Sequence, residues 1–162
     1  MTGEAPHPNA ALIAHLYDAL DRRDAEAMVA CYAPEATFSD PVFPALDAAG
    51  VAAMWRMLCA RGKDLKVVAS AIEADATKGR AHWVASYTFS ATGRPVENRI
   101  DARFEFRGGQ IIRHEDRFDL WRWLRQALGA KGALLGWLPP VQGATRAQAA
   151  KALAEWREKS SA

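Results

Sequence analysis

The spacing of apolar residues changes near Gly62, and this change limits the folds that the chain can adopt. Before Gly62, apolar residues recur at steps of three and four, which is the period of a helix with one buried face. After Gly62 the period falls to two, which is typical of strands with one buried face. Short turn sequences at 77–79, 92–95 and 108–109 divide this second part. The pattern therefore predicts helices first and an antiparallel sheet after them.

Three helices are expected before the sheet. The first begins at Asn9, which we interpret as its N-cap, and buries Leu12, Ile13, Leu16, Tyr17 and Leu20. The second begins at Asp24, buries Met28, Cys31 and Tyr32, and is stopped by Pro34. The third spans 48–61 with Asp47 as its N-cap. Between the last two, Pro41 holds Asp40 in an extended conformation.

The sheet is expected to contain four strands, at about 65–74, 80–91, 95–107 and 110–119. The turns between them are too short for a crossover, so the strands form an antiparallel meander. After the sheet we expect a short helix at 121–128 and a final helix that starts near Thr145.

These elements predict an α+β fold in which N-terminal helices pack on a strongly curved antiparallel sheet, with extra C-terminal helices. A chain of 162 residues, half of them hydrophobic, can bury one substantial core without disulfides or metal. We therefore expect a single domain over 1–162, with a core at 9–120 and a C-terminal helical extension at 121–162.

Composition limits the partners. The net charge of +2 is too small to indicate a nucleic-acid or membrane partner. Arg117 and residues 118–162 together carry eight Lys and Arg against three Asp and Glu, which we interpret as a solvated helix face.

Cys31 and Cys59 form no CxxC motif, which argues against a metal site. No leader pattern or long apolar run is present, so we expect a cytoplasmic protein.

The order of elements, together with several sequence strings, resembles the nuclear transport factor 2-like superfamily. Residues 16–20 and 30–41, the latter ending in Ser39-Asp40-Pro41, are similar to the N-terminal half of ketosteroid isomerases and SnoaL-like polyketide cyclases. Residues 104–106, 108–111 and 114–116 are similar to their last hairpin. The resemblance implies a cone-shaped, cystatin-like fold with a small-molecule pocket, no cofactor, and a homodimer formed through the sheet. It does not fix a function, because this scaffold hosts several activities.

The isomerase resemblance carries over only in part. Asp40 matches the aspartate of the Asp-Pro pair, which is the base in ketosteroid isomerase. Asp101 resembles the second aspartate by its local string, but strand alternation anchored on Phe104 and Phe106 places Ala102 inward and Asp101 outward. Leu16 occupies the position of the oxyanion tyrosine.

The resemblance to the epoxide hydrolases of the superfamily is also incomplete. Asp116 matches their water-positioning aspartate on the last strand. Their Arg-x-Asp pair falls on Trp83 and Ala85, which can serve as neither acid nor base.

The last strand carries a combination that does not depend on either relative. His114 and Asp116 alternate to the same face as Phe118, so all three are predicted to face the pocket. An imidazole beside a carboxylate in an apolar cleft suits general acid and base catalysis, with Asp40 as a third member. Asn98 could donate to a carbonyl or oxyanion. The pocket lining and substrate contacts are predicted to come from Asn98, Tyr17, Tyr32, Trp55 and Phe118.

Two classes of function stay open. The first is a cofactor-free isomerase, cyclase or epoxide hydrolase that uses Asp116, His114 and Asp40 on a small apolar molecule, without metal. The second is a non-catalytic pocket for a small ligand, or a dimerisation module. A desolvated carboxylate facing a cavity would favour the enzyme, and a filled interior would favour the alternative.

Overall fold

A single five-stranded sheet organises the protein, seen in a computed structural model that describes residues 5–161. The four predicted strands are present as β2 (Lys66–Ala74), β3 (Lys78–Phe89), β4 (Arg94–Arg107) and β5 (Gln110–Arg117). They pair antiparallel, each with the next along the chain. Gly108 and Gly109 have φ angles of +60° and +78°, as the predicted two-residue turn requires.

A fifth strand, β1 (Tyr32–Ser39), corrects the sequence prediction. The sheet order is β1-β5-β4-β3-β2, and β1 pairs with β5 in parallel, so the sheet is not a pure meander. The expected second helix ends early: α2 covers only Ala25–Val29, and Tyr32 already belongs to β1. Pro34 is compatible with β1 because this strand lies at the sheet edge, where a missing N–H can face away from the ladder.

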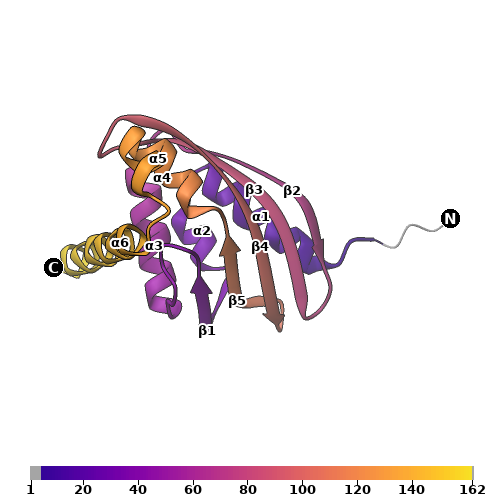
Figure 1. The fold of residues 1–162 in the computed structure, drawn as a ribbon. Coiled ribbons are helices and arrows are strands. Elements are labelled where there is room, and N and C mark those ends of the chain that lie inside the picture. The colour runs from indigo at the N-terminus through magenta and orange to yellow at the C-terminus, as the bar shows by residue number, and fades with distance from the viewer. Residues whose placement is uncertain (1–4, 162) are drawn as a thin grey trace.

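Bulges bend the sheet around the helices (Figure 1). The pairing of β2 with β3 shifts between Ser70 and Glu73, where Ala71 has a φ of +52°. The pairing of β4 with β5 shifts between Glu105 and Phe106. Each bulge adds a residue to one strand and increases its twist. The predicted α+β class with a curved, mostly antiparallel sheet is confirmed.

The predicted N-cap Asp47 is confirmed, and Asp24 caps the helix that was predicted to begin there. The helices are α1 (Pro8–Asp21), α2 and α3 (Ala48–Arg61). The side chains of Asp24 and Asp47 accept hydrogen bonds from the backbone N–H groups of Ala27 and Gly50, at 3.1 and 2.8 Å. Asn9 is not an N-cap, because α1 starts one residue earlier and is capped by His7. The Asn9 side chain instead donates to the carbonyl of Asp75, which ties α1 to the β2–β3 turn.

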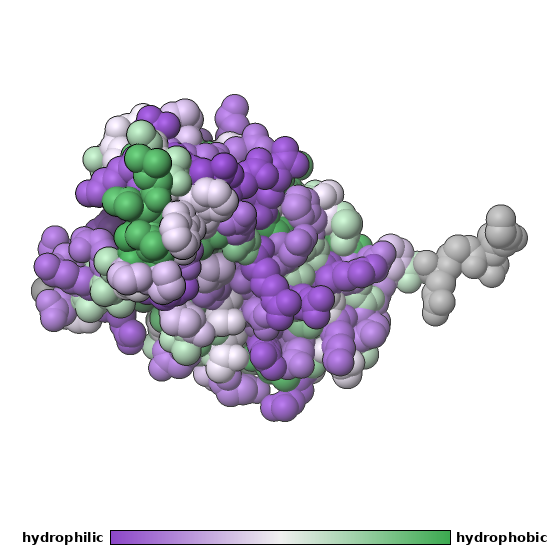
Figure 2. Space-filling view, viewed as in Figure 1, coloured by the Kyte–Doolittle hydropathy of each residue, from purple (hydrophilic) through white to green (hydrophobic). Residues whose placement is uncertain are grey.

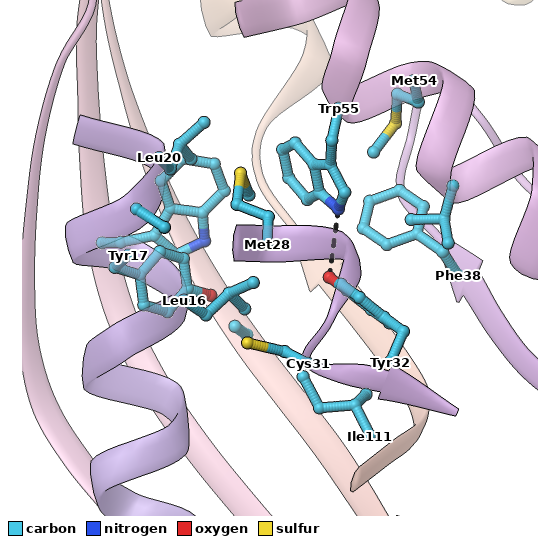
Figure 3. Close-up of a cluster of buried hydrophobic side chains, with 14 of the residues drawn as sticks. Leu16, Tyr17, Leu20, Met28, Cys31, Tyr32, Phe38, Met54, Trp55 and Ile111 are labelled. Carbon is cyan, nitrogen blue, oxygen red and sulfur yellow. Dashed lines mark hydrogen bonds between the residues drawn. The ribbon is translucent and has the colours of Figure 1, made fainter. Parts of the chain in front are cut away.

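The core lies between the helices and the inner face of the sheet. The helix α1 packs on β2 and β3, and α3 packs on β1. Side chains from α1, α2, β1, α3 and β5 meet in one cluster, drawn in Figure 3: Leu16, Tyr17, Leu20, Met28, Cys31, Tyr32, Phe38, Met54, Trp55 and Ile111. No described helix is both long and apolar enough to cross a membrane.

Three helices follow the sheet: α4 (Leu120–Leu128), α5 (Ala130–Leu135) and α6 (Pro139–Ser160). The predicted start of the last helix near Thr145 is wrong by six residues. Pro139 and Pro140 form the start of α6. Proline is tolerated there because it lacks a backbone N–H, and the N–H groups of the first helical turn have no partner within the helix. The long α6 packs against α3 and leads away from the sheet (Figure 1).

The edge strand β1 should contribute strongly to stability through Phe38. This side chain is buried and packs edge-on against the rings of Trp55 and His114, with centroid distances of 5.8 and 4.9 Å. We expect Phe38→Ala to lower the free energy of unfolding by about 3–5 kcal/mol, as measured by urea denaturation. Val68→Ala, at an exposed position on β2, is the control and should change it by less than about 0.5 kcal/mol. A loss below about 1 kcal/mol for Phe38→Ala would show that β1 is not packed as described.

Candidate active site

A cavity of about 290 Å³ lies between α3, α4 and the inner face of the sheet. Its walls are mostly apolar and include Met54, Trp55, Trp83 and Phe118. Its polar lining includes Asp40, Asn98 and Asp116, together with Arg61, Tyr87, Thr88 and Ser90. This is the arrangement of a small-molecule site, in which a few polar groups orient a ligand among apolar walls.

Asp40 is positioned by the turn that follows β1. Its Oδ1 accepts hydrogen bonds from the backbone N–H groups of Val42 and Phe43, at 2.7 and 2.6 Å. Its Oδ2 has no hydrogen bond to any described residue. Burial raises the pKa of Asp40 to about 6; the negative charge of Asp116 also raises it, and the two backbone donors offset part of the rise. Asp40 can therefore both hold and release a proton near neutral pH.

Asp116 is held by two donors on a single oxygen. Its Oδ1 lies 2.8 Å from Nε2 of His114 and 3.4 Å from Nε1 of Trp83. Asp116 is 3% exposed and His114 is fully buried. No described residue hydrogen bonds to Oδ2 of Asp116, so this oxygen is available to a ligand in the cavity.

A chain of hydrogen bonds behind Asp116 fixes the state of His114. Nε1 of Trp55 donates to the Tyr32 hydroxyl at 3.1 Å (Figure 3), and this hydroxyl lies 2.8 Å from Nδ1 of His114. The buried Tyr32 proton has no other acceptor among the described residues, so it must point to Nδ1. Nδ1 is then an acceptor, and the ring proton sits on Nε2 and is donated to Asp116. His114 is therefore a neutral imidazole in this arrangement.

His114 consequently lies behind the cavity wall and not in it. Both ring nitrogens are engaged, and the ring packs on Phe104 and Phe38, with centroid distances of 4.4 and 4.9 Å. The structure thus places the predicted His114–Asp116 pair side by side but gives the two residues different surroundings. Only Asp116 faces the cavity.

The predicted lining residues divide in the same way. Asn98, Trp55 and Phe118 line the cavity, whereas Tyr17 and Tyr32 lie in the core beside it. The Tyr17 hydroxyl is buried and has no hydrogen-bond partner among residues 5–161. Burial raises the pKa of Tyr17 well above its usual value, and the nearby charge of Asp116 adds to this effect. Tyr17 therefore stays a neutral, weakly polar neighbour of the site.

Sequence reasoning predicted neither the hydrogen bond of Trp83 to Asp116 nor any part for Trp123. Trp83 donates to Asp116, and its inward direction follows from strand alternation in β3. Trp123 lines the cavity from α4 and donates to the Tyr87 hydroxyl at 2.6 Å. No local signal connects Trp123 to the site, because α4 lies beyond the recognised core.

Asp101 lies on the opposite face of the sheet. Its side chain is 81% exposed and lies 2.9 Å from Nδ1 of His82. Ala102 is buried and pairs with Asp116 across the sheet, as strand alternation predicts. The register of β4 against β5 is continuous from Asp101 to Phe104, so no bulge turns Asp101 inward. The site thus lacks the second aspartate of the isomerase pattern.

A larger, open groove of about 770 Å³ lies on the charged outer side of the sheet. Some of its charged groups form exposed ion pairs, for example Arg80 with Glu73 at 2.6 Å. Such exposed pairs are worth little energy and leave no desolvated group for catalysis. Among the described residues, no group of three or more His, Cys, Asp or Glu side chains could hold a metal ion.

Comparison with known proteins agrees with this fold. Residues 13–114 match the SnoaL-like domain, and the chain belongs to this family. A search of curated proteins finds no match to the chain.

Several solved structures share the fold. IdmH, a proposed polyketide cyclase from Streptomyces antibioticus, is 26% identical, with a TM-score of 0.64 over 76% of this chain and 100% of its own. A proposed polyketide cyclase from Xanthomonas campestris pv. campestris is 23% identical, with a TM-score of 0.60 over 74% and 96%. An epoxide hydrolase from M. tuberculosis, described as LEH-like, is 16% identical, with a TM-score of 0.60 over 80% and 96%. The last two comparisons show the fold alone.

The hydrogen-bond chain predicts one tautomer of His114. We expect ¹⁵N-resolved NMR of the protein at neutral pH to show a protonated Nε2 and an unprotonated Nδ1. Tyr32→Phe removes the donor to Nδ1 and leaves the Trp55 N–H unpaired, so this variant should lose about 1–3 kcal/mol of stability. A protonated Nδ1 in the unmodified protein would contradict the direction of the chain.

The raised pKa of Asp40 predicts a pH-dependent cost in stability. Between the ordinary carboxyl pKa of about 4 and the folded value of about 6, the folded state binds more protons than the unfolded state. The free energy of unfolding therefore falls as the pH rises through this window. Asp40→Asn keeps the oxygen acceptor but cannot ionise, so it should be more stable than the parent above about pH 6, by up to roughly 3 kcal/mol.

Urea denaturation of both proteins between about pH 4 and pH 8 measures this difference. The advantage of Asp40→Asn should shrink toward zero at the acid end. A difference that stays constant with pH would show that Asp40 has an ordinary pKa.

Proposed function

We propose that this protein is a cofactor-free enzyme that moves a proton on a small, largely apolar carbonyl compound. The observation that carries the proposal is that two carboxyl groups, the half-buried Asp40 and the buried Asp116, line one largely apolar cavity. Each has an Oδ2 with no hydrogen bond to a described residue, and each is held through Oδ1. A desolvated pair of this kind suits general acid and base catalysis.

In this proposal Asp116 is the base. It takes a proton from the carbon next to the carbonyl, so the C–H bond breaks and its electrons move onto the carbonyl oxygen as an enolate. The N–H groups of His114 and Trp83 hold Oδ1 of Asp116 and leave Oδ2 to accept the proton. His114 acts as a positioning residue because its own nitrogens are both engaged.

Asp40 and Asn98 supply the complementary groups. With a pKa of about 6, Asp40 is protonated in part of the molecules near neutral pH and can donate that proton to the enolate oxygen. The Asn98 amide, which also lines the cavity, can donate a hydrogen bond to the same oxygen. Proton removal and charge stabilisation then occur in one largely apolar cavity.

Cyclase or isomerase chemistry fits these residues better than epoxide hydrolysis. Ring closure through an enolate and migration of a double bond both begin with the proton removal described above. An epoxide hydrolase of the superfamily uses an Arg-x-Asp pair at the positions of Trp83 and Ala85, and both of these side chains line the cavity here. IdmH, which shares the fold, is described as a proposed polyketide cyclase.

The size of the cavity points to a small substrate. At about 290 Å³ it lies at the lower end of the range of ligand pockets, which is about 300–1,000 Å³. A compound of one or two rings is therefore the expected substrate class.

Exchange of α-protons tests this function without knowledge of the natural substrate. The protein is incubated in D₂O with monocyclic and bicyclic ketones such as cyclohexanone and 1-tetralone, and loss of the α-proton signal is followed by NMR. We expect faster exchange with the enzyme for at least one ketone. Asp116→Asn should slow this enzymatic rate by about a hundredfold or more, because the amide keeps the shape but cannot accept the proton.

Asp101→Asn is the matched control, because it makes the same chemical change on the outer face of the same sheet and should leave exchange unchanged. Equal rates for Asp116→Asn and the parent would overturn the proposed role of Asp116. Saturable ketone binding without accelerated exchange would instead favour a non-catalytic binding pocket.

A further inference from the structure

An exposed apolar patch lies on the C-terminal helices, outside the cavity. We define this patch as Trp121 on α4, Leu134 and Leu135 on α5, and Trp137 in the turn before α6. Leu134 and Trp137 are 72% and 60% exposed, which is unusual for side chains of this size. Figure 2 shows hydrophobic side chains gathered over α4 and α5, at the upper left of the view.

Close helix packing holds the patch in place. Gly132 and Gly136 let α5 lie directly against α4, since a Cβ atom at Gly132 would collide with the Leu124 carbonyl. The indole of Trp121 donates to the Ala133 carbonyl at 3.2 Å, and that of Trp137 donates to the Leu134 carbonyl at 3.0 Å. Both indoles are thus fixed by α5, and the two leucines of α5 remain exposed beside them.

Positive charges predominate around the patch, although the exposed Asp119 caps the start of α4. Residues 120–154 contain three arginines and two lysines but no Asp or Glu. Arg122, Arg125 and Lys131 are exposed on α4 and α5. The Arg125 guanidinium lies over the Trp121 ring at 4.6 Å. The total net charge of +2 conceals this local concentration of positive charge.

We propose that the patch binds the surface of an anionic lipid bilayer. Exposed Leu and Trp side chains next to Lys and Arg are typical of helices that lie in a membrane interface, where tryptophan favours the headgroup level. Each basic residue near an anionic surface adds attraction. The expectation that no membrane is bound came from the small total charge and from the absence of a spanning segment, and neither bears on interfacial binding.

The same charges argue against a second copy of the chain as the occupant. A symmetric contact through the patch would bring Arg122, Arg125 and Lys131 of one copy against the same residues of the other, with no carboxylate on α4 or α5 to compensate. An anionic surface removes this repulsion.

The helix α4 also connects the patch to the cavity. Trp121 belongs to the patch, and Trp123, two residues later, lines the cavity wall. An apolar ligand that partitions into a bilayer would therefore be concentrated next to the cavity. The membrane proposal does not depend on catalysis.

Vesicle co-sedimentation with the full chain tests the proposal. The probes are vesicles of phosphatidylcholine alone and vesicles of phosphatidylcholine with about one quarter phosphatidylglycerol. We expect binding to the anionic vesicles that is at least about tenfold stronger than to the neutral ones. It should weaken strongly when NaCl is raised from about 0.05 M to about 0.5 M, because salt screens the attraction.

Two variants separate the apolar from the electrostatic contribution. Leu134→Ser with Trp137→Ser should weaken binding to anionic vesicles about tenfold or more, and so should Arg122→Glu with Lys131→Glu. Val68→Ser, an equally exposed apolar position on β2, is the control and should bind like the parent. All changed side chains are exposed, and an unchanged urea midpoint confirms that the variants fold.

Several results would overturn the proposal. These are no binding to either kind of vesicle, equal binding to both, and binding that neither double variant weakens. Sedimentation velocity provides the remaining test: a concentration-dependent dimer that Leu134→Ser with Trp137→Ser abolishes would assign the patch to a second copy of the chain.

Discussion

The hydrogen-bond chain from Trp55 through Tyr32 and His114 to Asp116 is the interaction on which the rest of the structure depends. It draws one group from α3, one from β1 and two from β5, and Trp83 of β3 closes it from the other side. A carboxylate among apolar walls is costly to bury unless such donors satisfy it. Because the partners come from four different elements, the site forms only when those elements pack in their observed register. The packing that folds these four elements together is therefore the same packing that places Asp116 in the site.

Local physical chemistry predicted most of the fold. The period of two and the turn glycines located four strands, and Asp24 and Asp47 located two helix starts. β1 was not predicted because its pairing with β5 joins residues that are far apart in sequence. The pairing is parallel, so no hairpin turn in the sequence indicates it. The start of α6 was misplaced because the pair Pro139-Pro140 is equally compatible with the end of a preceding segment and with the first turn of a helix.

Strand alternation also predicted the direction of the main site residues. It placed Asp101 outside and Asn98, His114 and Asp116 inside, as the exposures show. It could not show that His114 stands behind Asp116, since that depends on Tyr32 and Trp55 from other elements. Nor could it show that Trp123 reaches the cavity, because the position of α4 follows from long-range packing. Strand alternation thus predicts which face of the sheet a side chain lies on. The hydrogen-bond partner that fixes the chemical role of the side chain can be identified only from the tertiary structure.

The central claim is that Asp116 and Asp40 present their free oxygens to one ligand. A crystal structure with a cyclic 1,3-diketone such as dimedone tests this most directly, because its enol resembles the state formed by proton removal. We expect the diketone in the cavity, with one oxygen or its acidic carbon about 3 Å from Oδ2 of Asp116 and its other end near Asp40 or Asn98. A cavity closed by side chains, or a diketone bound without contact to either carboxyl group, would contradict this claim.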